Sequence, residues 1–393
     1  MSTVVLAFSG GLDTSWCIPY LRERGYEVIT VTVDVGGVED LSELSKQLGA
    51  VAHFTIDAKQ IFFDEVLRWL IAGNVTKGGT YPLCVGAERT LQARLVAEKA
   101  RQLGAVAIAH GCTAAGNDQI RFEVACRCVA PDLILLAPVR DLTPSRAEQV
   151  AFLKEKELPV PAHGAEYSVN SGLWGVTIGG AETTGSECTI PEDKWIRTKN
   201  AFAKPLPAKT LSIEFRQGIP TAIDGQKSGP VEIIEILDGI AGAYGIGRGI
   251  HLGETILGIK GRVAFEAPAA HVLLMAHREL EKLVLTGRQI NLKDSLASAY
   301  GEMVHSGLLT EPACRDIEAF FASTQARVTG KVKVCLQTGF AFVEGVSSPY
   351  SLHAASRAVY GEAVGEWSSE DAKGFARIYG LPSILHARAG GKS

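Results

Sequence analysis

The sequence predicts an α/β fold in which a doubly wound parallel sheet is followed by an α+β domain and a helical tail. Two observations indicate this arrangement. From Val4 to Arg140, short β-rich runs alternate with amphipathic helical runs, which is typical of a parallel sheet covered by helices on both faces. Beyond Ser145 the alternation stops, and β-rich and helical pieces occur in separate blocks.

The expected strands of the parallel sheet are short apolar runs rich in β-branched residues. They are residues 4–8, 28–33, 50–56, 106–110 and 133–137. Helices are predicted between them over residues 12–24 and 91–103. The longest gap contains a predicted helix near residues 61–71 and then the Gly/Thr-rich residues 73–82, which we expect to form an active-site loop.

The second half of the chain begins at a Pro/Gly-rich break. After a predicted helix over residues 148–156, the stretch LPVPAHG at residues 158–164 indicates a domain boundary. Beyond it we expect β-structure at residues 211–215, 231–236 and 326–346, and helices at 269–285, 292–305 and 370–378. The predicted domains are residues 1–160, residues 161–360 and a helical tail over residues 361–393.

Composition favours a cytoplasmic protein that acts on small molecules. The 393 residues are 46% hydrophobic and 21% charged, with a net charge of −4 and no long run of like charges, so neither a nucleic-acid groove nor a membrane-binding patch is predicted. No apolar stretch approaches the roughly 20 residues that a membrane span needs, and no cleavable leader follows Met1. The eight cysteines contain no CxxC pair and the histidines lack metal-ligand spacing, so we predict neither a disulfide framework nor a protein-bound metal site.

The segment VVLAFSGGLDTS, residues 4–15, predicts a strand that leads through a phosphate-binding loop into a helix. Gly10 and Gly11 leave room for backbone N–H groups to approach an anion, and the helix adds its free N–H groups and the positive end of its dipole. A plain strand-to-helix turn would explain these glycines, but not the hydroxyl groups of Ser9, Thr14 and Ser15 that surround them. The segment therefore predicts a pyrophosphate cradle.

Two motifs resemble a known family. SGGLDTS after the first strand resembles the loop of the N-type ATP pyrophosphatases, of the adenine nucleotide alpha hydrolase-like fold, which split ATP into AMP and pyrophosphate. HGCTAAGNDQIRFE, residues 110–123, resembles the aspartate-binding signature of the argininosuccinate synthase family. Further matches in order are Tyr81-Pro82-Leu83, Tyr167-Ser168, Gly247-Arg248, Gly258-Ile259-Lys260, Phe265-Glu266 and Ala276-His277-Arg278.

The resemblance implies a two-step ligase reaction that uses ATP, Mg²⁺, citrulline and L-aspartate. A ureido oxygen attacks the α-phosphate of ATP, pyrophosphate leaves, and the aspartate amine then displaces AMP. The resemblance also implies a homotetramer, with a nucleotide-binding domain (1–160), a synthetase, substrate and multimerisation domain (161–360) and a C-terminal helical tail that makes an oligomer contact (361–393). By position, the ATP-binding residues are Ala7, Ser9, Gly10, Gly11, Asp13, Thr14, Ser15, Val33 and Gly111.

The residues implied to bind aspartate are Thr113, Asn117, Asp118 and Arg121. Their chemistry fits this role, because hydroxyl, amide and guanidinium groups bind carboxylates and Asp118 can accept a hydrogen bond from the incoming amine. We expect Asp13, Ser15, Asp118 and Arg121 to carry the catalytic roles.

The implied acceptor site departs from the family pattern. The residues expected to bind citrulline are Tyr81, Asn117, Arg121, Ser168, Thr177, Glu254 and Phe265. By register, Gly86 replaces a family serine, Gly253 replaces a glutamate that pairs with the α-amino group of citrulline, and Phe265 replaces a tyrosine. Glu254, one residue from Gly253, is the expected substitute carboxylate. Asn170, Gly172 and Gly179 stand where the family usually has Asp, Asn and Glu.

Two alternatives remain at this point. The same ATP and aspartate chemistry could act on a different ureido or amide acceptor in specialised metabolism, which the changes at Gly86, Gly253 and Phe265 favour. A protein that binds a nucleotide without splitting it is the other alternative, and it would be expected to have lost polar residues such as Asp13 and Asp118, which are present. His277 lies in a predicted helix and is expected to be structural.

Overall fold

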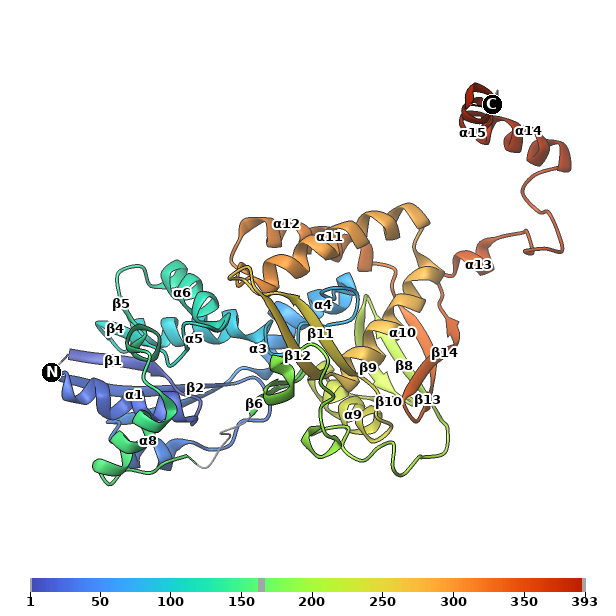
Figure 1. Cartoon of the computed structure of the whole chain (residues 1–393). Helices are drawn as coiled ribbons and strands as arrows, with labels where there is room; N and C mark the ends of the chain where they lie inside the picture. Colours follow the sequence, from blue (N-terminus) through green and yellow to red (C-terminus); the bar gives the residue numbers. More distant parts are fainter. Residues whose placement is uncertain (1, 162–166, 391–393) are drawn as a thin grey trace.

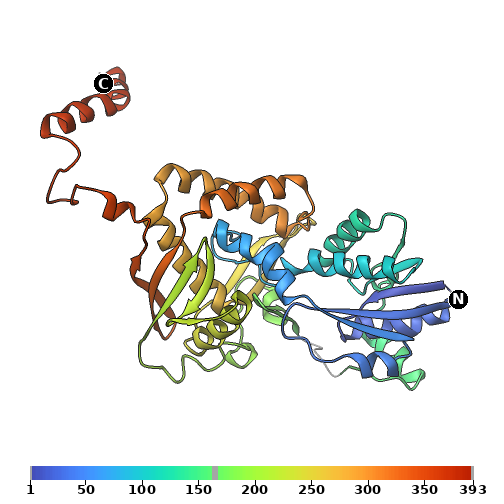
Figure 2. The same cartoon turned by 180° about the vertical axis from the view of Figure 1, so that it is seen from behind.

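The structure is a computed structural model that describes residues 2–161 and 167–390 (Figure 1). The predicted domain boundary at residues 158–164 therefore lies partly outside the described residues. The N-terminal part forms one body around a parallel sheet, and residues from 167 onward form most of a second body beside it (Figures 1 and 2).

The predicted parallel sheet is confirmed. Its strands are β1 (Ser2–Ala7), β2 (Tyr26–Asp34), β3 (Ala52–Asp57), β4 (Ala107–Ala109) and β5 (Ile134–Leu136), in the order β3-β2-β1-β4-β5. Every pairing is parallel. The strand order reverses between β1 and β4, and in open α/β sheets ligands bind in the crevice beyond the strand ends at such a point.

Helices cover both faces of this sheet because β1 is apolar on both. Val4 and Leu6 pack with α1 (Leu12–Glu23) and α8 (Arg146–Glu155), while Val5 packs on the opposite face toward α5 (Glu88–Gln102). The remaining helices of this body are α2 (Ser42–Gln47), α6 (Asp118–Val129) and α7 (Pro138–Leu142). The predicted helices near residues 12–24, 91–103 and 148–156 are thus present.

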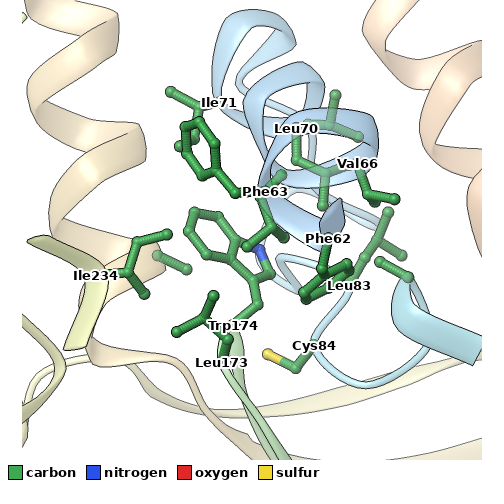
Figure 3. Close-up of a cluster of buried hydrophobic side chains, with 14 of the residues drawn as sticks. Phe62, Phe63, Val66, Leu70, Ile71, Leu83, Cys84, Leu173, Trp174 and Ile234 are labelled. Atoms are coloured by element: carbon green, nitrogen blue, oxygen red, sulfur yellow. The ribbon is translucent and has the colours of Figure 1, made fainter. Parts of the chain in front are cut away.

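A helical arm leads from the sheet into the second body. It comprises α3 (Lys59–Phe62), the π-helical turn η1 (Phe63–Leu67) and α4 (Arg68–Gly73), where we expected one helix. In Figure 3 the side chains of Phe62 and Phe63 lie around Trp174, which comes from the turn between two strands of the second body. Trp174 also donates a hydrogen bond to the carbonyl of Pro82, 2.9 Å away, so the core fixes the loop that follows the arm.

A buried polar network holds the same arm from its other side. Lys293 is fully buried and donates to the carbonyl of Ala72 at 3.0 Å, while its ammonium lies 2.8 Å from Glu281. His277 bonds Asn74 through Nδ1 at 2.9 Å and Gln325 through Nε2 at 2.8 Å. His277 is therefore structural, as expected.

The second body contains two antiparallel sheets. One has the order β11-β12-β7-β6, with β6 (Tyr167–Gly172), β7 (Gly175–Gly180), β11 (Arg248–Glu254) and β12 (Lys260–Glu266). The other has the order β10-β9-β8-β13-β14, with β8 (Lys209–Arg216), β9 (Ile219–Ile223), β10 (Gln226–Lys227), β13 (Gly330–Gln337) and β14 (Phe340–Ser347). The β-structure predicted at 211–215 and 326–346 belongs to the second sheet.

Helices connect and cover these sheets. They are α9 (Pro230–Ala243), α10 (Pro268–Val284), α11 (Gly287–His305) and α12 (Pro312–Gln325), with short 3₁₀ turns η2 (Ala181–Thr184) and η3 (Glu192–Lys194). The β-strand predicted at 231–236 is wrong, because these residues lie in α9. Pro230 occupies the first turn, where proline favours a helix, and Ile233, Ile234 and Leu237 are buried at helical spacing. The β-branched residues of this run misled the prediction.

The C-terminal tail leaves the body (Figures 1 and 2). It contains α13 (Leu352–Ala355), α14 (Ser369–Tyr379) and α15 (Leu381–Gly390), and neither of the last two helices buries a residue. Phe375, Ile378 and Tyr379 are 65%, 76% and 76% exposed. Within residues 2–161 and 167–390, no helix has the length and apolar character to cross a membrane.

Candidate functional site

The glycine-rich loop connects β1 to α1 at the sheet's switch point. Gly10 has a φ of +74°, and a Cβ there would lie 2.8 Å from Cδ2 of Leu41, so glycine suits both the backbone and the space. Gly11 is the N-cap of α1 and supplies no side-chain cap. The N–H groups of the first turn therefore remain available to an anion.

Polar side chains line this helix terminus. The hydroxyls of Ser9 and Thr14 lie 3.2 Å apart, and Thr14 donates to the carbonyl of Gly11 at 3.2 Å. Asp13 accepts a hydrogen bond of 2.8 Å from the amide of Gln149 on α8. Ser15 is fully buried, and its Oγ has no hydrogen-bond partner in the described part of the chain. A buried hydroxyl without a partner indicates a group that a ligand satisfies.

The loop after β4 closes on the first turn of α1. A Cβ on Gly111 would lie 2.9 Å from Cγ2 of Thr14 and 3.1 Å from its backbone nitrogen, so only glycine permits this approach. Val33 is buried near the end of β2, and the next residue, Asp34, accepts from the backbone of Gly36 and pairs with Lys59 at 2.9 Å. The predicted ATP residues thus surround the ends of β1, β2 and β4.

The predicted aspartate-binding residues lie at the start of α6. Asn117 is its N-cap, Asp118 is its first residue, and Thr113 is exposed in the preceding loop. The Oδ1 atom of Asn117 accepts from the backbone N–H of Ile256 at 3.0 Å, so the β11–β12 hairpin contacts this helix terminus. Both bodies therefore contribute to the site.

Arg121 already has protein partners. It is buried, donates from Nε and Nη2 to the carbonyl of His305 at 2.9 and 2.8 Å, and donates from Nη1 to Asp118 at 2.7 Å. These contacts occupy the guanidinium that the sequence assigned to a substrate carboxylate. In this structure Arg121 instead connects Asp118 to the C-terminal end of α11.

Arg89 was missed by the sequence analysis. Its Nε donates to Asp118 at 3.1 Å and its Nη2 donates to Asn170 at 2.9 Å. Burial disfavours the ionised form of Asp118, but Arg89 and Arg121 outweigh that effect and lower its pKa. Asp118 is thus an anion held between two cations. An ordinary arginine in the first turn of a helix carries no motif, and so no local signal identified Arg89.

Glu88 was also missed. It is 1% exposed, and its Oε2 has no hydrogen-bond partner among the residues the structure describes. Burial raises its pKa to about 7, although Arg89 acts in the opposite direction. A Cβ on Gly172 would collide with Oε2 of Glu88. The unusual Gly172 therefore provides the space for this carboxyl group.

Three predicted acceptor residues gather near the β11–β12 sheet. Tyr81 is buried, donates to the carbonyl of Cys84 at 2.7 Å, and its ring centroid lies 5.2 Å from that of Phe265. Phe265 on β12 pairs in register with Thr177 on β7. Burial raises the pKa of Tyr81, so its hydroxyl stays protonated and can donate.

Glu254 and Ser168 are exposed, in contrast to the buried Tyr81, Thr177 and Phe265. Glu254 is an exposed residue at the end of β11, and its carboxylate pairs with Lys260 at 3.1 Å. Ser168 is exposed on the edge strand β6, opposite Gly179. Where the family serine is replaced, a Cβ on Gly86 would lie 3.3 Å from Nη2 of Arg121.

An open cleft of about 530 Å³ adjoins these residues. It lies between the loop after α4, the β11–β12 hairpin and the end of α11. Its lining residues include Lys77, His251, Gly253, Glu254, Glu302 and His305. His251 stacks on Tyr81 with ring centroids 5.1 Å apart, and His305 carries the carbonyl bound by Arg121. The cleft is thus continuous with the acceptor side of the site.

Comparison with known proteins matches both bodies of the chain. The model of the arginosuccinate synthase N-terminal HUP domain matches residues 3–159, and that of the arginosuccinate synthase C-terminal domain matches residues 167–386. The argininosuccinate synthase of Methanocaldococcus jannaschii is 41% identical over 97% of this chain and 97% of its own length. Those of Lactiplantibacillus plantarum and Pyrobaculum aerophilum are each 39% identical, over 99% and 98% of this chain and 96% and 98% of their own lengths.

Proposed function

The chain belongs to the argininosuccinate synthase family, and from that membership we propose how its residues carry out the ATP-dependent condensation of citrulline with aspartate. The enzyme is a carbon–nitrogen ligase of arginine biosynthesis, and its products are argininosuccinate, AMP and pyrophosphate. The observation that carries the assignment of roles is the close approach of Gly111, in the loop that leads to α6, to the first turn of α1 at the switch point of the parallel sheet.

ATP is proposed to bind with its phosphates at the N-terminus of α1. Gly10 and Gly11 admit the phosphates to the backbone N–H groups, and the unpartnered hydroxyl of Ser15 donates to them. Mg²⁺ would accompany the pyrophosphate, with Asp13 as the nearby carboxylate. The described residues contain no group of three or more His, Cys, Asp or Glu side chains that could hold a metal ion.

In the first step the ureido oxygen of citrulline attacks the α-phosphorus, and the bond to the bridging oxygen breaks to release pyrophosphate. The protein supplies no covalent nucleophile in this step. Its contribution is to hold the reacting groups in line and to stabilise the developing charge with fixed donors. Tyr81, which is buried and protonated, and the Arg121 guanidinium are proposed to border the acceptor on the side opposite ATP.

In the second step the aspartate amine attacks the ureido carbon and AMP leaves with the ureido oxygen. The amine must be unprotonated, and Asp118 is proposed to orient it by accepting a hydrogen bond. Arg89 and Arg121 keep Asp118 ionised for this purpose. Thr113 and Asn117 are proposed to hold the carboxylates of aspartate near the N-terminus of α6, where the helix dipole favours negative charge.

We also propose a homotetramer, a cytoplasmic location and domain boundaries at residues 160 and 360. The exposed apolar side chains of α14 support the first of these, because a face that carries Phe375, Ile378 and Tyr379 needs a covering surface. Light scattering of the full chain and of a chain that ends at residue 360 tests this proposal. Loss of the tetramer in the shorter chain is expected, and an unchanged mass would contradict it.

The reaction itself is tested by measuring AMP and pyrophosphate with ATP, Mg²⁺, aspartate and citrulline. We expect one AMP and one pyrophosphate for each argininosuccinate formed, and none above background when citrulline is omitted. Formation of ADP and phosphate, or release that does not depend on citrulline, would contradict the proposed chemistry.

A further inference from the structure

The cleft beside Tyr81 contains donor groups that the proposed reaction has not used. Lys77, His251 and His305 line it, and they come from the loop after α4, from β11 and from the end of α11. The ammonium of Lys77 acts on the pKa of both imidazoles, and His251 acts on that of His305, so the three groups lie within electrostatic reach of one another. What they bind depends on the atoms that face the cleft.

His305 presents an N–H group without a partner. Its Nδ1 lies 3.4 Å from Nη2 of Arg121, which can only donate, so Nδ1 accepts and Nε2 carries the proton. His305 is 8% exposed, and its Nε2, which lies toward the backbone of Glu254, makes no hydrogen bond of standard geometry in residues 2–161 and 167–390. Burial, then Arg121, Lys77 and His251, lower the pKa of His305 to about 3, whereas the backbone of Glu254 opposes this effect. The ring is therefore neutral at physiological pH.

His251 provides a second unpartnered nitrogen. It is 8% exposed, stacks on Tyr81, and its Nε2 has no hydrogen-bond partner in the described chain. A Cβ on Gly253 would lie 2.5 Å from this atom, so the absence of a side chain at that position makes room for the imidazole. Burial and then Lys77 lower its pKa, which keeps the ring neutral. Buried polar nitrogens without partners are rare, and two beside one cleft indicate a ligand.

Hydrogen-bond donors and carboxylates occupy different parts of the cleft. Lys77 binds Glu302 at 2.6 Å, but an ammonium has three N–H groups and can bind a second anion. Glu302 and Glu254 are exposed and lie at the rim, where Glu254 pairs with Lys260. Donors thus lie within the cleft and carboxylates lie at its edge. A zwitterion whose carboxylate enters and whose ammonium stays near the rim matches this distribution.

The position of the cleft indicates which part of citrulline it can bind. The ureido group has to react beside Asp118, and Arg121 joins Asp118 on one side to the carbonyl of His305 on the other. An acceptor whose ureido group lies beside Asp118 and whose chain runs past Arg121 would place its far end in the cleft. We propose that Lys77, His251 and His305 bind the α-carboxylate of citrulline and so determine the acceptor specificity of this enzyme. This inference rests on the proposed function.

Steady-state kinetics of single variants test the inference. In His251→Ala and His305→Ala we expect the KM for citrulline to rise roughly 10- to 100-fold, because each variant removes a hydrogen bond to a charged group. The kcat and the KM values for ATP and aspartate should change far less. His251→Gln places an amide nitrogen near the position of Nε2 and should recover part of the loss. His353→Ala, an exposed histidine on α13, is the matched control and should leave all constants unchanged.

Two acceptor analogues identify the group that is bound. N-(4-aminobutyl)urea lacks the carboxylate of citrulline, and 5-ureidopentanoate lacks the amine. Wild-type enzyme should discriminate strongly against the first analogue, and His251→Ala should reduce that discrimination by about tenfold or more. The discrimination against 5-ureidopentanoate should persist in the variant. If His251→Ala instead reduces only the discrimination against 5-ureidopentanoate, the carboxylate assignment is overturned.

A further variant guards against a folding defect. Gly253→Ala places a methyl group 2.5 Å from Nε2 of His251 and must displace the ring, so it should raise the KM for citrulline without removing the imidazole. An unchanged KM in both His251→Ala and Gly253→Ala, with wild-type turnover of citrulline, would overturn this inference alone. Wild-type enzyme that forms no pyrophosphate with citrulline would instead refute the proposed function.

Discussion

The proposed ATP and aspartate region and the proposed acceptor region of this enzyme are built in different ways. The first consists mainly of two continuous segments, the loop from Ser9 to Ser15 and the loop that leads into α6, each after a strand of the parallel sheet. The groups proposed to bind substrate in this region include backbone N–H groups at helix N-termini. The acceptor region instead uses side chains from the loop after α4, from β7, from the β11–β12 hairpin and from the end of α11.

We infer that this difference underlies the contrast in the sequence, where the family resemblance implies an unchanged ATP and aspartate region and an altered acceptor region. A backbone site requires glycines at fixed positions, because any Cβ at Gly111 would meet the backbone of α1. A side-chain site can change one residue when a neighbour in space changes with it. Gly253 leaves space that His251 occupies, and Gly172 leaves space that Glu88 occupies. The altered acceptor positions are therefore coupled to their neighbours.

Asp118 lies where the two regions meet, and its removal should have the largest effect. In Asp118→Ala, Arg89 and Arg121 both lose their carboxylate, and the aspartate amine loses its proposed acceptor. We expect kcat/KM for aspartate to fall by roughly 10²- to 10³-fold, equivalent to about 3 to 4 kcal/mol. The rate of pyrophosphate release at varied aspartate concentrations measures this kcat/KM. A loss below about fivefold, confirmed on folded protein by circular dichroism, would argue against this role.

Gly111→Ala tests whether the ATP region depends on backbone approach. The added Cβ would lie 3.1 Å from the backbone nitrogen of Thr14, so the first turn of α1 must move away from the phosphates. We expect the KM for ATP to rise about tenfold, the effect of about 1.4 kcal/mol, while the KM for citrulline stays nearly constant. Equal rises in both values would show that the two regions are less separate than we describe.

Glu88→Gln tests the coupling between Glu88 and Gly172, which leaves the space that the Glu88 carboxyl group occupies. Burial raises the folded-state pKa of Glu88 from 4.5 to about 7, so the folded protein binds this proton more tightly than the unfolded chain. The stability linked to the carboxyl is fully present below about pH 4.5 and is lost as the pH rises to about 7. Glutamine does not titrate. Relative to wild type, the unfolding free energy of Glu88→Gln should therefore increase by about 2 to 3 kcal/mol between pH 5 and pH 8.

Urea unfolding of both proteins at the two pH values provides the measurement. If the unfolding free energies of Glu88→Gln and wild type differ by the same amount at pH 5 and at pH 8, then folding does not raise the pKa of Glu88. Gly172→Ala is the matched variant, because its methyl group would displace the carboxyl of Glu88 and should weaken the pH dependence.

Much of the ATP and aspartate region could be predicted from the sequence, because each of its features depends on residues that are close together along the chain. The five parallel strands and the turn at Gly10 and Gly11 each depend on a few consecutive residues. Arg89, His251 and His305 could not be found in this way, since their partners are distant along the chain. The error at α9 has a different cause, because two local signals disagreed there and the β-branched residues outweighed the helical spacing of the buried ones. The sequence also could not show that Arg121 binds the carbonyl of His305.

Glu254→Gln should have the smallest effect. Sequence position made Glu254 the expected substitute for a family glutamate, but its carboxylate is exposed and pairs with the exposed Lys260. We expect less than about a threefold change in the KM for citrulline, because exposed ion pairs contribute little. A rise above tenfold in the KM for citrulline would instead show that the acceptor is recognised at the rim of the cleft and not in its interior.

The ureido oxygen of citrulline is proposed to attack the α-phosphorus of ATP at the N-terminus of α1. Citrulline labelled with ¹⁸O at the ureido oxygen is the sharpest test of this step, because that oxygen should leave with AMP in the second step. We expect one ¹⁸O atom in the AMP for each argininosuccinate formed and none in pyrophosphate. Recovery of the label in water or pyrophosphate, with unlabelled AMP, would refute this attack.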